Sequence, residues 1–333
     1  MKALVLHSAK NLTYEPDWSE ISIPPDWVEV KVHASGICGS DLPRIMQTGA
    51  YHHPMIPGHE FSGEIVLPGD SGIPAGEKVA VLPIIPCGQC AGCQVAPFHC
   101  THYDFIGSRR DGGFAELCTV PPENLLRLPA NTAYEEGAFI EPIAVTLHVL
   151  RQSGMMPGAR VLVFGAGAIG ILTAQWARIL GAREVVIADL RDESLAIAEQ
   201  CQAGKVINPK SEEFKSLTDF DYIFEAAGST AALLSAIELA GPRAILTVVG
   251  RETKDTVIPL MSFERLMRKE LTLKGCWGYD LRQDADLVYR VFAGGQLILK
   301  PMLTHRLELQ DGPDFIRGMW NKAFFYCKAM FIL

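Results

Sequence analysis

The sequence predicts a two-domain α/β protein, in which a mostly β domain with long loops is joined to a doubly wound parallel sheet. Three observations predict this class. The length of 333 residues suits about two domains. Short β-type runs separated by glycine and proline fill the first 140 residues. Strands and helices then alternate through the middle of the chain, as they do in βαβ units.

The composition indicates an ordinary globular protein and excludes several function classes. Hydrophobic residues make up 48% of the chain and charged residues 20%, which is enough apolar material for a core in each domain. The 38 acidic and 30 basic residues give a net charge of −8, which argues against nucleic-acid and membrane partners. The apolar stretch Val161–Ala177 is short for a membrane span and contains three glycines. No targeting segment is evident, so we expect a cytoplasmic protein.

The expected elements follow from local patterns. Val28–Val32 alternates apolar and polar residues, which is typical of a half-buried strand, and Val79–Leu82, Phe114–Val120 and the tail Ala329–Leu333 are further strand candidates. The alternating part begins with the buried-type strand Arg160–Phe164. In chain order it continues with helix Ile169–Leu180, strand Glu184–Ala188, helix Glu193–Cys201, strand Tyr222–Glu225, helix Ala231–Leu239 and strand Arg243–Val249.

A glycine-rich turn predicts a dinucleotide site. The run from Gly165 to Gly170 fits G-x-G-x-x-G, follows an apolar strand, opens a helix, and precedes Asp189 at the end of the next strand. Asp189 would accept hydrogen bonds from the ribose hydroxyls, which favours NAD over NADP; Arg191 could instead serve a 2′-phosphate. The alternative is a plain turn with Asp189 as a solvated strand end. The predicted cofactor residues are Gly165, Gly167, Ile169, Gly170, Asp189 and Arg191.

Four cysteines in one short loop predict a structural zinc site. Cys87, Cys90, Cys93 and Cys100 offer four thiolates, the ligand set of a closed tetrahedral site. Proline and glycine break regular structure in this loop, so metal ligation would supply the missing stability. An iron–sulfur cluster and unligated thiols are the alternatives, and His99 could compete with Cys100 as fourth ligand.

A second, open metal site is suggested by residue types alone. Cys38, His59 and Glu141 would supply a thiolate, an imidazole and a carboxylate, which leaves a coordination position for water or substrate. They are far apart in the sequence, so their spacing cannot establish that they converge.

These segments resemble the zinc-dependent medium-chain alcohol and polyol dehydrogenases over nearly the whole chain. The resemblance rests on Cys38-Gly-Ser-Asp-Leu-Pro-Arg, Gly58-His-Glu-Phe-Ser-Gly63, the loop from Tyr103 to Glu116, the cysteine loop and the glycine turn, in the same order. It implies a GroES-like catalytic domain from 1–142 and 280–333, which encloses a Rossmann NAD-binding domain at 143–279. It also implies two zinc ions per chain.

The resemblance further implies roles at the catalytic zinc. Cys38, His59 and Glu141 would be its ligands, and Glu60 an adjacent acid able to enter or leave the coordination shell. Zinc would lower the pKa of a bound alcohol before hydride transfer to the nicotinamide. Ser40 would pass the alcohol's proton outward. Pro43 stands where many family members carry the next relay histidine, so His52, His53 or ordered water would have to replace it.

The substrate prediction rests on two neighbouring arginines and on the resemblance. Arg109 and Arg110 lie in a glycine-flanked loop, and a guanidinium fork suits bidentate phosphate binding. Solvated surface charge, or an ion pair with Asp111, is the alternative. The resemblance implies galactitol 1-phosphate as substrate and L-tagatose 6-phosphate as product. A sorbitol-type or L-threonine dehydrogenase, and a non-catalytic zinc- and nucleotide-binding protein, are rival interpretations. Family members are commonly dimers or tetramers, so we expect a homo-oligomer.

Overall fold

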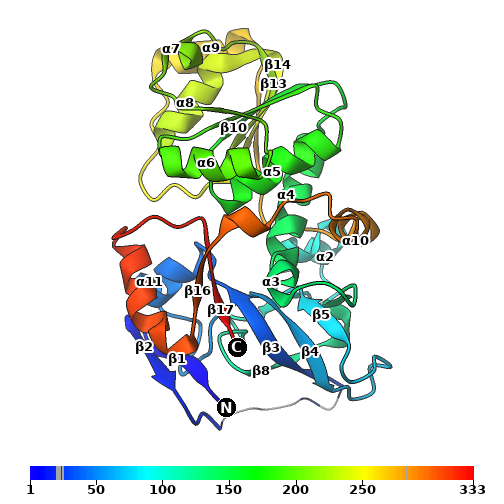
Figure 1. Ribbon diagram of the computed structural model, residues 1–333. Helices are drawn as coiled ribbons and strands as arrows, with labels where there is room; N and C mark the ends of the chain where they lie inside the picture. Colours follow the sequence, from blue (N-terminus) through cyan, green and yellow to red (C-terminus); the bar gives the residue numbers. More distant parts are fainter. Residues whose placement is uncertain (20–23, 25, 283) are drawn as a thin grey trace. The chain divides into compact units, whose positions relative to one another are not determined.

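The computed structural model describes residues 1–19, 24, 26–282 and 284–333, which form two compact units (Figure 1). The first unit combines Met1–Glu141 with Leu303–Leu333, so both ends of the chain build it. The second unit is Pro142–Met302. Helix α4 (Ile140–Ser153) carries the chain from the first unit into the second.

A seven-stranded sheet is the framework of the first unit. Its strands run in the order β16-β17-β3-β4-β5-β9, with β8 also pairing β3. All of its pairs are antiparallel except β16 with β17. The strands are β3 (Val28–Gly36), β4 (Glu60–Leu67), β5 (Lys78–Val81), β8 (Leu117–Val120), β9 (Leu125–Arg127), β16 (Leu303–Leu307) and β17 (Lys328–Ile332).

Smaller elements complete the first unit. Two hairpins accompany the sheet, one from β1 (Ala3–Ser8) with β2 (Asn11–Glu15) and one from β6 (Ile84–Ile85) with β7 (Asp104–Phe105). The helical segments are short except for the last. They are α1 (Asp41–Pro43), the π-helical turn η1 (Arg44–Thr48), α2 (Ala91–Val95), η2 (Pro97–His99), η3 (Pro122–Asn124), α3 (Tyr134–Gly137), η5 (Leu309–Asp311) and α11 (Gly312–Trp320).

The alternation expected at Val28–Val32 is confirmed by burial in β3. Val28, Val30 and Val32 are buried, whereas Lys31 between them is exposed. The three valines pack in one core cluster with Phe61 of β4. Each buried valine contributes roughly 2 kcal/mol of transfer free energy relative to an exposed one. The burial pattern therefore fixes the register of β3, because a shift by one residue would expose all three valines.

The second unit is a six-stranded parallel sheet with the order β12-β11-β10-β13-β14-β15. Counted from its first strand, this is the order 3-2-1-4-5-6 of a dinucleotide-binding fold. Helix α5 packs on β10 and β11, and α8 packs on β13 and β14. The strands are β10 (Arg160–Phe164), β11 (Glu184–Ala188), β12 (Lys205–Ile207), β13 (Phe220–Glu225), β14 (Ala240–Val248) and β15 (Thr272–Gly275).

Helices alternate with the strands of this unit. The predicted strands at Arg160–Phe164 and Glu184–Ala188 have the observed bounds, and the predicted α/β class is confirmed. The helices are α5 (Ala168–Ile179), α6 (Asp192–Gln200), α7 (Glu212–Lys215), α8 (Thr230–Leu239), α9 (Leu260–Arg268), α10 (Ala285–Ala293) and η4 (Lys300–Met302).

The second boundary between the units lies after Met302, whereas the sequence predicted it at 280. Residues between these points belong to the second unit because specific contacts tie them to it. The guanidinium of Arg151 in α4 binds both carboxylate oxygens of Asp284, with Nη2 2.9 Å from Oδ1. The side-chain amide of Gln175 pairs with the backbone of Ile298 in both directions. Such contacts join residues more than 100 positions apart, so local sequence patterns do not report them.

Helices long and apolar enough to cross a membrane are absent from the residues that the structure describes.

Candidate functional site

The four cysteines of the predicted structural site converge. The sulfurs of Cys87, Cys90, Cys93 and Cys100 all lie within 4.8 Å of one another. Sγ of Cys93 is 3.8 Å from that of Cys87 and 3.6 Å from that of Cys90. Cys100, and not His99, completes this group in the structure.

The loop closes because glycine stands where its two halves meet. A Cβ at Gly92 would lie 1.8 Å from the carbonyl oxygen of His99, so any side chain there would force the halves apart. Backbone N–H groups of Thr101 and Cys93 lower the pKa of the Cys90 thiol to about 5. The N–H groups of Cys87 and His102 also point to Sγ of Cys100. These donors stabilise the Cys90 thiolate, whereas burial and the neighbouring thiols raise the pKa of Cys93 to about 12. Four sulfurs at these distances form the ligand set of a tetrahedral zinc ion.

Replacing Cys93 should remove the metal from this loop. We expect Cys93→Ser to lose one zinc per chain and to lower the melting temperature by several degrees, since the loop has little regular structure of its own. Metal analysis and thermal unfolding measure both effects. Cys118→Ser is the matched control, because Cys118 is buried elsewhere in the unit. A full zinc content in Cys93→Ser would contradict the assignment.

A second group of metal-ligating atoms forms where β3 and β4 pair. The ligand atoms of Cys38, His59 and Glu60 lie within 4.8 Å of one another. Cys38 follows β3, and Glu60 begins β4 directly opposite Gly36 in the antiparallel register. A Cβ on Gly36 would lie 2.5 Å from Oε2 of Glu60, so glycine leaves the space that this carboxylate occupies. Strand pairing thus brings together residues that are separated by a loop.

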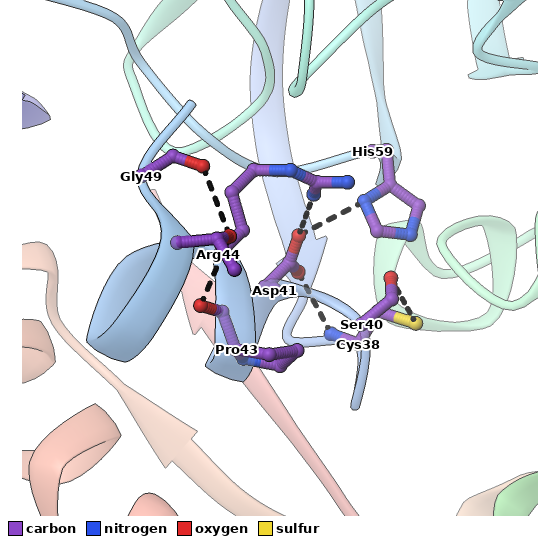
Figure 2. A network of polar contacts seen from close by, with 8 residues as sticks. Cys38, Ser40, Asp41, Pro43, Arg44, Gly49 and His59 are labelled. Atoms are coloured by element: carbon purple, nitrogen blue, oxygen red, sulfur yellow. Dashed lines mark hydrogen bonds and ion pairs between the residues drawn. The ribbon is translucent and has the colours of Figure 1, made fainter. Parts of the chain in front are cut away.

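Asp41 orients the histidine of this group, as Figure 2 shows. Its Oδ1 lies 3.1 Å from Nδ1 of His59 and 3.2 Å from Nη1 of Arg44, and its Oδ2 accepts a 3.0 Å hydrogen bond from the backbone of Cys38. Asp41 thus forms ion-pair contacts with both His59 and Arg44. Nε2 of His59 remains available for a metal, and a carboxylate behind the ligating imidazole is usual at such sites. Sequence reasoning missed Asp41, although it lies only three residues after Cys38.

The charges around this group suit a cation. Burial would lower the pKa of His59, but the charges of Asp41 and Cys38 raise it well above its usual value. Burial would raise the pKa of Asp41, but His59 and Arg44 lower it. Both side chains are buried. The acidic groups around the imidazole therefore favour its positively charged form. A metal ion would take over that role, and the residues present therefore fit zinc.

Lys328 is a further buried partner that sequence reasoning missed. Its Nζ lies 2.6 Å from Oε2 of Glu60, and both side chains are almost fully buried. Burial would lower the pKa of Lys328, but the Glu60 carboxylate raises it. Lys328 begins β17, which pairs β3 on the side opposite β4, so the sheet places the lysine beside the site. No local motif could have indicated it.

Glu141, the predicted third ligand, lies buried in the first turn of α4 but outside the group of three atoms. Burial raises the pKa of its carboxyl to about 7, His59 opposes this rise and Glu60 adds to it. Glu141 is thus in the electrostatic field of the site. Its ligand role stays a prediction, and Glu60 is the carboxylate that the structure places with Cys38 and His59.

Removing Lys328 should destabilise the metal-free protein by leaving Glu60 buried and unpaired. We expect Lys328→Met to lower the free energy of unfolding by roughly 3–5 kcal/mol. Adding Glu60→Gln should restore much of this loss, because the uncompensated charge is then gone. Zinc binding should restore part of the lost free energy of unfolding in the Lys328→Met variant. Chemical unfolding with and without metal measures these differences.

The matched control is Lys215→Met, which breaks an exposed ion pair with Glu212 and should cost no more than about 1 kcal/mol. A double variant as unstable as Lys328→Met alone would show that the lysine acts by packing and not by charge.

Ser40 lies beside Cys38, and its role as a proton-transferring group stays a prediction. Its Oγ donates to Sγ of Cys38 at 3.3 Å (Figure 2). His52 and His53, the suggested relay replacements, are exposed and contact backbone groups of Arg109 and Ala50. Both histidines therefore help to shape their surface loop, and the step beyond Ser40 stays open to ordered water.

The glycine turn of the second unit has the features that the motif predicts. Gly165 has φ of +95°, and a Cβ on Gly170 would lie 1.7 Å from the carbonyl oxygen of Gly165. Gly167 precedes α5, and a Cβ there would meet no atom within 4 Å. The turn is therefore tight at Gly165 and Gly170 and open at Gly167, where a phosphate can approach the backbone and the helix N-terminus. Ile169 lies in the first turn of α5.

Asp189 connects this turn to the end of β11. Its Oδ2 accepts a 2.8 Å hydrogen bond from the backbone N–H of Ala166, and its Oδ1 accepts one of 2.9 Å from the backbone N–H of Arg191. Arg191 is exposed at the start of α6. The buried Glu225, which sequence reasoning missed, similarly accepts hydrogen bonds from Ala227 and Ser229 after β13. These carboxylates shape the loops at the carboxyl ends of the strands, where parallel sheets bind ligands.

Two glycine variants should separate cofactor binding from folding. Gly167→Ala should leave the melting temperature nearly unchanged, because its methyl group enters open space, yet weaken NADH binding by roughly tenfold or more. Gly170→Ala should lower the free energy of unfolding by roughly 1–3 kcal/mol through overpacking. Fluorescence titration with NADH and thermal unfolding distinguish the two. Unweakened NADH binding by Gly167→Ala would contradict the predicted cofactor position.

Comparison with known proteins identifies the family. Residues 24–130 match the alcohol dehydrogenase GroES-like domain, and residues 168–293 match the zinc-binding dehydrogenase family. The galactitol 1-phosphate 5-dehydrogenase of Escherichia coli K12 is 38% identical over 310 residues, which cover 89% of this chain and 90% of that protein. The chain belongs to the zinc-binding alcohol dehydrogenase family. The predicted resemblance, fold and enzyme class are thereby confirmed.

Other relatives are named for a different substrate, and one of them is bound to NADP. Sorbitol dehydrogenase 2 of Saccharomyces cerevisiae is 29% identical over 330 residues, covering 93% of this chain and 91% of that protein. The crystal structure of galactitol-1-phosphate dehydrogenase from Escherichia coli has a TM-score of 0.89 at 35% identity, with complete coverage of both chains. A putative zinc-binding dehydrogenase from Sinorhizobium meliloti 1021, bound to NADP, has a TM-score of 0.90 at 28% identity and covers 100% of this chain and 99% of its own.

Proposed function

We propose that this enzyme oxidises a secondary alcohol of a polyol phosphate with NAD, and that the substrate is galactitol 1-phosphate, giving L-tagatose 6-phosphate and NADH. The observation that carries the chemistry is the convergence of the half-buried Cys38 with the buried His59 and Glu60. The substrate class is supported by similarity to galactitol 1-phosphate 5-dehydrogenase.

Two zinc ions per chain are part of this proposal. Cys87, Cys90, Cys93 and Cys100 would hold a structural ion, and Cys38, His59 and a carboxylate of Glu141 or Glu60 a catalytic one. Zinc at the second site supplies Lewis acidity that lowers the pKa of an alcohol.

The side chains around the catalytic site have distinct tasks in this proposal. Asp41 holds the imidazole of His59 in one orientation. Ser40 exchanges its hydrogen bond with Cys38 for one with the substrate hydroxyl, accepts that hydroxyl's proton at Oγ and passes its own to water. Glu60 is held by Lys328 and can exchange that partner for the metal. Glu141, whose pKa burial raises to about 7, would add negative charge once it is deprotonated.

The cofactor is NAD in this proposal because of the charge near the ribose. The Asp189 carboxylate would repel a 2′-phosphate, and it stands at the end of β11 where the ribose is expected. Gly165, Gly167, Ile169 and Gly170 would surround the pyrophosphate. The exposed Arg191 favours NADP as the alternative.

A homo-oligomer is supported by apolar side chains exposed on the second unit. Leu260, Phe263 and Met267 of α9 are exposed, as are Leu273 of the edge strand β15 and Trp277. Exposed apolar groups of this kind mark protein–protein contacts.

A reducing cytoplasm is supported by the four thiols that lie together in position for a metal.

A substrate screen tests the proposed function. The zinc-loaded enzyme should reduce NAD fastest with galactitol 1-phosphate, more slowly with sorbitol, and more slowly still with L-threonine. Absorbance of NADH in parallel reactions measures this. Greater activity on sorbitol would favour the sorbitol-type alternative, and no NADH from any polyol would favour a non-catalytic protein.

A further inference from the structure

The two neighbouring arginines of the loop after β7 have different surroundings. Arg110 pairs with Asp104 and also lies over Trp27, with Cζ 4.7 Å from the ring centroid. The expected alternative partner, Asp111, instead accepts a hydrogen bond from the backbone of Ile56. Arg110 is therefore already neutralised by a carboxylate.

Arg109 has two aromatic neighbours and no carboxylate partner in the part of the chain that the structure describes. Its Cζ lies 4.0 Å from the ring centroid of Tyr51 and 4.3 Å from that of Tyr103. Its Nε is buried and lacks a hydrogen-bond acceptor. Aromatic rings cover the faces of a guanidinium and leave its N–H groups in the plane, where they can bind an anion. Arg109 thus has an uncompensated charge and an unsatisfied donor on one rigid group.

The loop that carries Arg109 and Arg110, here called the arginine loop, is fixed against the segment that carries His59. A Cβ on Gly107 or Gly112 would lie 2.2 Å or 2.0 Å from the carbonyl oxygen of Gly58, the residue before His59. The backbone of Gly113 donates to that same oxygen at 2.9 Å. Glycine at these positions lets the two backbones touch, so the loop cannot shift independently of His59.

Aromatic contacts also connect the arginine loop to His59. The Phe105 ring lies edge-on to His59 with centroids 5.6 Å apart, and Tyr103 lies edge-on to Phe105 at 6.5 Å. Arg109 then lies over Tyr103. A row of aromatic rings therefore connects His59 to the Arg109 guanidinium. A hydroxyl bound at His59 and an anion bound at Arg109 would then belong to the two ends of one extended substrate.

We infer that Arg109, held by Tyr51 and Tyr103, binds the phosphate of the substrate, whereas Arg110 braces the loop through Asp104. This inference rests on the proposed polyol phosphate substrate. A guanidinium forms two parallel hydrogen bonds to two phosphate oxygens, and a neutral hydroxymethyl group cannot replace that contact. Arg109 would thereby select phosphorylated over plain polyols.

The test compares kcat/KM for galactitol 1-phosphate with kcat/KM for galactitol in matched variants. Arg109→Ala should lower this ratio by about 100-fold, the loss expected for two charge-assisted hydrogen bonds. Arg110→Ala should change the ratio by less than about threefold. Loss of its support for the loop would affect the reaction with both substrates to a similar extent. Tyr103→Leu should lower the ratio by an intermediate amount. Zinc content and melting temperature confirm that each variant is folded.

A direct binding measurement keeps this inference separate from the proposed function. Calorimetry with inorganic phosphate should show binding to the wild-type protein and at least tenfold weaker binding to Arg109→Ala. A wild-type ratio below one would contradict the polyol phosphate substrate. A high wild-type ratio that Arg109→Ala leaves intact, or equal phosphate binding by both proteins, would overturn the role of Arg109.

Discussion

The pairing of β3 with its two neighbours is the constraint on which the catalytic site depends. At Gly36, near its end, β3 is bordered by Glu60 of β4 on one side and by Met330 of β17 on the other. This register places Glu60 and Lys328 beside Cys38 at the point where β3 ends. Because backbone hydrogen bonds fix the register, the site is built into the sheet and does not depend on flexible loops alone.

Charge compensation explains why so many ionisable groups can be buried there. Isolated charges in a protein interior are costly, but here each acid has a cationic neighbour. Asp41 contacts both His59 and Arg44, and Glu60 contacts Lys328. A divalent metal ion at Cys38, His59 and Glu60 would add positive charge beside the same carboxylates. Stability of the unit and metal binding are therefore coupled through the same buried carboxylates.

Close backbone contacts at glycine recur in the cysteine loop, the nucleotide turn and the loop that carries Arg109 and Arg110. Gly92 lies against the backbone of His99 in the cysteine loop, and Gly170 packs on Gly165 in the nucleotide turn. Gly107 and Gly112 lie against the backbone of Gly58. A side chain at any of these positions would need space that another backbone occupies. Rigid placement of loops is the common result, and it allows side chains on different loops to act on one ligand.

The sequence by itself determined the features that depend on neighbours along the chain. The strand Arg160–Phe164, the glycine turn and the grouping of four cysteines within one loop follow from local spacing, because their geometry is set within a few residues. Only the tertiary structure placed Lys328 beside Glu60, gave Arg109 and Arg110 different partners, and moved the boundary between the units to Met302. Those outcomes depend on strand register and on packing between distant segments, which local spacing does not encode.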